Sequence, residues 1–137
     1  GPVVFGRLDP GPATRRRWLV GWTGLMALLF GGLALGLPAW LDIALMLVIG
    51  LISGYIVLQY ADVRGAYPAA ITGRAMAAFT MAMFMGVAIM QWATGIVASL
   101  AKGAGHDPYI AVMGGIAAWL ALSAVGFALL PQPPKST

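Results

Sequence analysis

Four long stretches of this 137-residue chain contain no Asp, Glu, Lys or Arg: residues 18–41, 43–61, 75–101 and 108–134. Each stretch consists mainly of Leu, Ala, Val, Ile, Met and Gly. The hydrocarbon core of a bilayer is about 30 Å thick, and roughly 20 apolar residues of helix cross it. Lipid offers the backbone no hydrogen-bond partners, so a spanning segment of this kind forms a helix. The sequence therefore predicts an all-α integral membrane protein with four transmembrane helices.

The overall composition excludes an ordinary soluble domain. Hydrophobic residues make up 61% of the chain and charged residues 9%, whereas soluble domains carry about 25% charged residues. The net charge of +4 does not indicate nucleic-acid binding, because the charged residues lie in the connections between apolar stretches. In a membrane protein that placement sets the topology. The absence of cysteine excludes disulfides and thiolate metal sites.

Proline and glycine divide the chain into helices and connections. Pro38 breaks the first apolar stretch, Asp107 and Pro108 form a helix start, and Pro131 ends the last helix. Residues 1–14 are rich in Gly and Pro and are expected to be irregular. The expected order is a loop at 1–17, helices at 18–37 and 40–60, a loop at 61–74, a helix at 75–100, a loop at 101–107, a helix at 108–130 and a tail at 131–137.

The basic residues predict the orientation in the membrane. One side receives seven of them, and the other side receives only Lys102; the seven are Arg7, Arg15, Arg16, Arg17, Arg64, Arg74 and Lys135. Cytoplasmic connections carry the excess of Lys and Arg in membrane proteins. Both ends of this segment and the 61–74 loop are therefore expected in the cytoplasm and the 101–107 loop outside, in a multi-pass protein of the cell (inner) membrane.

Nothing in the sequence supports an enzyme. His106 is the only histidine, and a metal site needs several ligands. The serines in the apolar stretches have no base nearby in the sequence, and the glycines do not form a phosphate-binding loop. We therefore expect no enzymatic activity, no catalytic residues, no cofactor and no metal.

Polar residues within the helices are the candidates for a substrate pathway. Gln91 lies near the middle of the third predicted helix, on the same face as Thr80, and Tyr55 and Gln59 lie one turn apart on the second. A polar side chain in lipid is costly unless it faces water or a partner. These four residues are expected either to line a cavity or to hydrogen-bond from helix to helix.

Charged residues at the cytoplasmic boundary are candidates for a gating contact. Asp62 follows the second predicted helix, and Arg74 precedes the third. The two are expected to form an ion pair that makes and breaks between states of the protein. The alternative is that Asp62 is solvated and Arg74 only sets the topology, as Arg64 is expected to do.

Three segments resemble a known family. They are PAAITGRA at 68–75, FTMAMFMG at 79–86 and QWATG at 91–95. They are similar to the loop and eleventh helix of major facilitator superfamily transporters. The sequence GRLD at 6–9, followed by Arg15, Arg16 and Arg17, is similar to a degenerate copy of that superfamily's G-x-L-x-D-R-x-G-R-R loop, with Pro10 where the family has a basic residue.

The resemblance covers nearly the whole chain, as the last four helices of a twelve-helix bundle. It implies that the second and third of these helices border the central pathway and that the first and fourth lie outside. It also implies the C-terminal part of a secondary-active carrier of a small solute, inactive alone, whose partners are the bilayer, the remaining helices and an unknown substrate. The alternative is a small four-helix membrane anchor, or a subunit of a membrane complex, without transport activity.

Overall fold

The computed structural model describes residues 2–8 and 11–131, and every regular element in them is helical. Two short elements accompany five longer helices. In chain order the elements are α1 (Pro2–Arg7), α2 (Pro12–Leu33), α3 (Ala39–Ile52), the 3₁₀ helix η1 (Ser53–Tyr55), α4 (Ile56–Ala66), α5 (Ala69–Gly103) and α6 (Pro108–Leu129). Asp9, Pro10 and residues 132–137, which include Lys135, lie outside the described residues.

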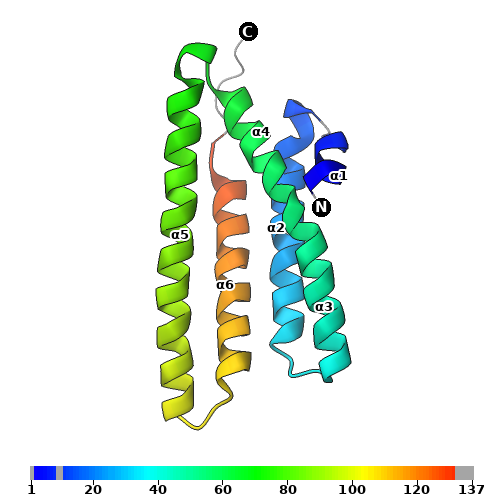
Figure 1. Ribbon diagram of the computed structural model, residues 1–137, viewed down its shortest axis with the longest axis vertical. Coiled ribbons are helices and arrows are strands. Elements are labelled where there is room, and N and C mark those ends of the chain that lie inside the picture. Colours follow the sequence, from blue (N-terminus) through cyan, green and yellow to red (C-terminus); the bar gives the residue numbers. More distant parts are fainter. Residues whose placement is uncertain (1, 9–10, 132–137) are drawn as a thin grey trace.

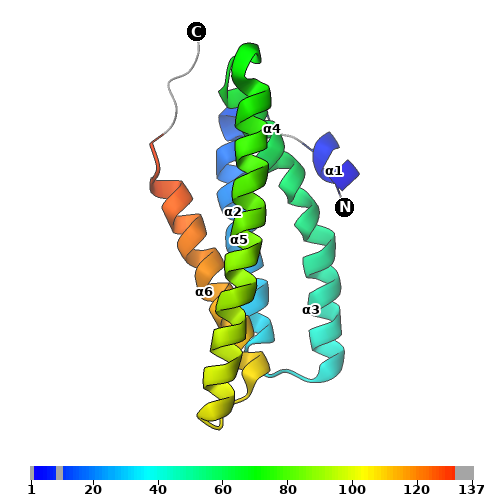
Figure 2. The ribbon, with the colours of Figure 1, turned by 60° about the vertical axis from the view of Figure 1, so that its left-hand side comes forward.

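The long helices lie side by side and alternate in direction (Figures 1 and 2). Helices α2 and α5 run one way, while α6 and the continuous run of α3, η1 and α4 return. The α2–α3 and α5–α6 connections lie at one end of the bundle, and the α4–α5 connection lies at the other. The start of α2, with its three arginines, shares this second end with the last turn of α6. The described arginines of α2, α4 and α5 therefore lie toward this second end, and Lys102 lies toward the first.

Three helical segments are long and apolar enough to cross a membrane: Ala39–Ala66, Ala69–Gly103 and Pro108–Leu129. Helix α2 is not among them, because its first turns contain Arg15, Arg16 and Arg17 and it already ends at Leu33. The prediction of an all-helical chain is confirmed for the described residues, and three of the helices are capable of spanning a membrane, whereas the count of four spans is not confirmed. Helix α5 has 35 residues, and at about 1.5 Å per residue it is longer than the hydrocarbon core is thick.

The helix boundaries differ from the expected ones at both predicted cytoplasmic loops. The expected loop at 1–17 contains α1 and the first turns of α2. The expected loop at 61–74 is largely helical, because α4 continues to Ala66 and α5 already begins at Ala69. Pro68 takes the N-cap position of α5 and the alanines that follow favour a helix.

The second predicted helix is interrupted rather than uniform. The backbone tightens into η1 at Ser53, Gly54 and Tyr55, and the Ser53 hydroxyl donates a 2.7 Å hydrogen bond to the carbonyl of Gly50. Gly and Ser together commonly mark a change of helix direction. Before this helix, Gly36 in the α2–α3 connection has a φ of 65°, a conformation that glycine adopts readily.

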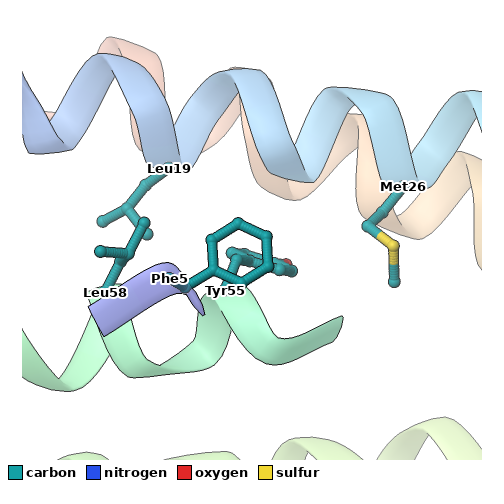
Figure 3. Close-up of a cluster of buried hydrophobic side chains, with 5 residues drawn as sticks. All are labelled: Phe5, Leu19, Met26, Tyr55 and Leu58. Carbon is teal, nitrogen blue, oxygen red and sulfur yellow. The ribbon is translucent and has the colours of Figure 1, made fainter. Parts of the chain in front are cut away.

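The buried core of the described residues lies where α1, α2, η1 and α4 meet. Its side chains are Phe5, Leu19, Met26, Tyr55 and Leu58; Figure 3 shows Phe5, Leu19, Tyr55 and Leu58 gathered together, with Met26 further along α2. The Phe5 and Trp22 rings form an edge-to-face pair with centroids 5.0 Å apart, which fastens α1 to α2. Helix α2 also packs along α6. Within this chain α2 is thus a central helix, whereas the resemblance implies an outer one.

Candidate functional site

Tyr55, one of the four pathway candidates, is a core residue. Its side chain is 9% exposed and points toward α2 (Figure 3). Its hydroxyl lies 3.4 Å from the Thr23 hydroxyl of α2. This contact is the helix-to-helix hydrogen bond that was the alternative to cavity lining. Gln59, one turn further along, is half-buried on α4.

Thr80 lies at the contact between α4 and α5. Its hydroxyl donates to the carbonyl of Met76 at 2.9 Å and lies 3.4 Å from the Tyr60 hydroxyl. The Tyr60 and Phe79 rings pack edge to face beside it, with centroids 5.1 Å apart. Thr80 therefore joins two helices of this chain.

Gln91 differs from the other candidates because it is exposed. It lines an open groove of about 470 Å³ along α5, together with Trp92, Gly95, Ile96, Ser99 and Leu100. The Thr94 and Ser99 hydroxyls nearby donate to the Gln91 and Gly95 carbonyls of their own helix. Among the described residues, no group hydrogen-bonds to the Gln91 amide. The groove thus has apolar walls and one free amide.

The four pathway candidates do not converge on one site in this chain. Tyr55 faces α2, Thr80 faces α4, and Gln91 opens onto the outer face of α5. Residues that share one face of a predicted helix do not meet at one site when different neighbouring helices pack against different turns of that face. Their common role in a substrate pathway stays a prediction.

The two residues of the predicted latch are at the same end of the bundle but are not paired. Asp62 is half-buried on α4, and Arg74 is exposed near the start of α5. No ion pair joins these two described residues. A latch that closes in another state of the protein stays a prediction.

Arg15 and Arg16 form helix-to-helix contacts that were not predicted from the sequence. Arg15 is 7% exposed, and its Nη1 donates a 3.0 Å hydrogen bond to the carbonyl of Ala61 on α4. Arg16 donates to the carbonyls of Phe127, at 2.7 Å, and Leu130 at the end of α6. Its guanidinium also lies 5.1 Å from the centroid of the Phe127 ring. The two arginines therefore join α2 to α4 and to α6.

A signal for the Arg16 contact was present in the sequence. The last carbonyls of a helix lack partners within that helix, and basic side chains commonly bind them. Helix α6 has no basic residue in its own last turn. Because neighbouring residues of a helix point in different directions, three consecutive arginines inside α2 reach different neighbours, and Arg17 stays exposed.

Within residues 2–8 and 11–131, no three His, Cys, Asp or Glu side chains are grouped closely enough to hold a metal ion. The groups of chemical interest are therefore the Gln91 groove, the Arg15 and Arg16 contacts and the boundary charges. Comparisons of this chain with protein-family models, curated proteins and solved structures give no match.

Proposed function

We propose that this chain is the C-terminal part of a secondary-active carrier of the major facilitator superfamily, which moves a small solute across the cell membrane. The resemblance of residues 68–95 and the arginine-rich start of α2 supports the family. The three apolar helices support the membrane setting. The observation that carries a transport role is the exposed Gln91 amide in the apolar groove of α5.

On the exposed face of α5, the Gln91 side chain requires water or a polar group as its neighbour in place of lipid. Large apolar side chains line much of this helix, including Met81, Phe84, Met85 and Trp92. These side chains suit lipid or further helices. An amide without a partner costs several kcal/mol in an apolar medium, so Gln91 is better placed against water or a polar partner. A water-filled pathway beside α5 satisfies this requirement.

An anchor or subunit of a membrane complex is the second candidate. Helix α3 also exposes large apolar side chains, among them Trp40, Leu47 and Leu51, and these would suit a partner protein as well as lipid. In that case the Gln91 amide hydrogen-bonds to the partner, and water does not reach it. The two functions therefore differ in the solvent access of Gln91.

We expect Gln91→Cys to react with a membrane-impermeant thiol reagent in intact cells that produce the protein. The chain has no cysteine of its own, so the introduced thiol is the only target in it. Leu122→Cys on α6 is the matched control, because Leu122 is 70% exposed in an apolar helix and should face lipid. Labelling at Gln91 and not at Leu122 supports the pathway. Equal lack of labelling at both positions contradicts it and favours the subunit.

The proposed orientation predicts opposite labelling at the two ends of the bundle. Ala104→Cys, in the connection after α5, should react with the impermeant reagent added outside intact cells. Ala66→Cys, at the end of α4, should react only after the membrane is permeabilised. Both alanines are exposed, and Ala104 avoids the positive φ of the neighbouring Gly105. The reverse labelling would place the arginine-rich end outside and refute the orientation.

A further inference from the structure

An open groove on α2 has no role in the function proposed above. It has a volume of about 360 Å³ and is lined by Trp18, Gly21, Trp22 and Leu25. Gly21 forms its floor, because a Cβ at this position would have open space around it. Trp18 and Leu25 are 37% and 36% exposed. The groove is therefore a depression in the apolar surface of α2 that no side chain of the described residues fills.

The walls of the groove are aromatic and are held in place by the core. The centroids of the Trp18 and Trp22 rings lie 6.2 Å apart, and the ring planes are inclined at 54°. Trp22 in turn packs edge to face against Phe5 of α1, which belongs to the core cluster. Rings that are already fixed lose little freedom when a ligand binds beside them. The groove is therefore preformed.

The groove runs from a charged residue into the apolar part of α2. Arg17, Gly21 and Leu25 follow one another at four-residue spacing, so they share one face of the helix. The charge-free stretch begins at Trp18, which puts Arg17 at its boundary. From Trp18 to Leu25 the helix extends about 10 Å, and one leaflet of the hydrocarbon core is about 15 Å thick. The groove thus spans most of one leaflet, with the charge at the headgroup end.

Arg17 is the arginine of its run that the described residues leave without a hydrogen bond or an ion pair. Arg15 and Arg16 donate to carbonyls of α4 and α6, whereas Arg17 is exposed. The surroundings are positively charged, because α2, α4 and α5 bring five arginines and one carboxylate, that of Asp62, to this end of the bundle; the arginines are Arg15, Arg16, Arg17, Arg64 and Arg74. An anionic group is the complement that Arg17 lacks.

We propose that this groove binds an anionic phospholipid, with one acyl chain against Gly21 and the phosphate on Arg17. A guanidinium matches a phosphate through two parallel N–H···O hydrogen bonds, and tryptophan rings are favoured at the level of the headgroups. The expected orientation places the groove in the cytoplasmic leaflet, which carries the anionic lipids. The inference needs the membrane setting but not the proposed transport function.

Helix α1, which packs against Trp22, favours lipid as the occupant. Val3 and Val4 are 71% and 55% exposed, and Leu8 just after the helix is 52% exposed. Exposed apolar side chains of this kind mark a contact with a membrane or a protein, and Arg7 in the last turn of α1 favours an anionic surface. The other occupant is a further protein helix, which would exclude lipid from the two tryptophans of the groove.

Quenching of tryptophan fluorescence by brominated lipids tests the site. Trp40→Phe, Trp92→Phe and Trp119→Phe replace three exposed residues and leave Trp18 and Trp22 as the reporters among the five tryptophans of the chain. This variant is reconstituted in mixed phosphatidylglycerol and phosphatidylcholine vesicles, with bromine on the chains of one lipid or of the other. We expect phosphatidylglycerol to bind beside the reporters about five-fold more strongly, the effect of one arginine at an anionic surface. Equal quenching by the two brominated lipids would overturn the proposal.

Two substitutions and a matched control, each added to this variant, locate the lipid. Arg17→Gln should abolish most of the preference for phosphatidylglycerol. Arg64→Gln should leave it nearly unchanged, because it removes an exposed arginine of α4 at the same end of the bundle. Equal reductions from both would mean that diffuse surface charge attracts the lipid, and the site would be refuted. Gly21→Leu fills the open space of the groove and should lower quenching by either lipid; unchanged quenching would place the lipid elsewhere.

A groove covered by protein gives a different result. A second variant keeps only Trp119 of α6, which is 55% exposed, and carries phenylalanine in place of the other four tryptophans. Circular dichroism spectra equal to that of the unaltered chain establish that the variants are folded. Quenching of Trp119 without quenching of Trp18 and Trp22 would show that protein occupies the groove, and it would overturn the assignment to lipid.

Discussion

Leu58→Ala is expected to lower the free energy of unfolding by about 2–3 kcal/mol. Leu58 is 1% exposed and packs in the core cluster with Leu19, Phe5 and Tyr55 (Figure 3). The substitution leaves a cavity where α1, α2 and α4 meet. In a membrane the helices gain little from the hydrophobic effect itself, so most of the loss comes from missing dispersion contacts.

Leu51→Ala, a few turns earlier in the same run of helix, is the matched control. Leu51 is 66% exposed, and we expect its truncation to change stability by less than about 0.5 kcal/mol. Unfolding of the two variants in mixed micelles, titrated with sodium dodecyl sulfate and followed by circular dichroism, gives the comparison. Equal losses from both variants would mean that the core of this chain does not lie around Leu58.

Much of the helical architecture could be predicted from the sequence, because the backbone of a segment in lipid must form its hydrogen bonds within that segment. Apolar stretches without charge predict helices, and Asp107 with Pro108 marks the start of α6, where the cap is observed. Other helix boundaries were predicted only from the positions of charged residues, and these predictions were wrong. Arg74 was expected in a loop, but α5 already begins at Ala69, because a helix that emerges from the membrane tolerates a basic side chain.

The candidate site was harder to predict, since a side chain's role depends on which neighbour covers its face. Tyr55 and Gln91 are both polar residues within apolar helices, yet Tyr55 contacts α2 and Gln91 opens onto an outer groove. Asp42 lies within the helix expected at 40–60, but a sequence does not show which neighbour covers a side chain at the start of a helix. The structure places it inside α3 with a buried oxygen.

Arg16→Ala is expected to lower the free energy of unfolding by about 1–3 kcal/mol, the range for hydrogen bonds from charged groups. Arg16 satisfies the carbonyls of Phe127 and Leu130 at the end of α6 and stacks over the Phe127 ring. Its removal leaves these carbonyls without their donor and removes these contacts between α2 and the end of α6. Arg17→Ala is the control, because Arg17 is exposed and its loss should cost less than about 0.5 kcal/mol.

Arg16→Lys separates this structural role from the topological role that the sequence alone suggested. Lysine keeps the positive charge that orients the chain, but it lacks the guanidinium Nη2 that donates to both carbonyls and the flat group that lies over the Phe127 ring. We expect Arg16→Lys to keep the labelling pattern at positions 104 and 66 while regaining less than half of the stability lost in Arg16→Ala, measured by the same detergent titration. Full recovery with lysine would mean that Arg16 serves topology alone and that its contacts with α6 contribute little.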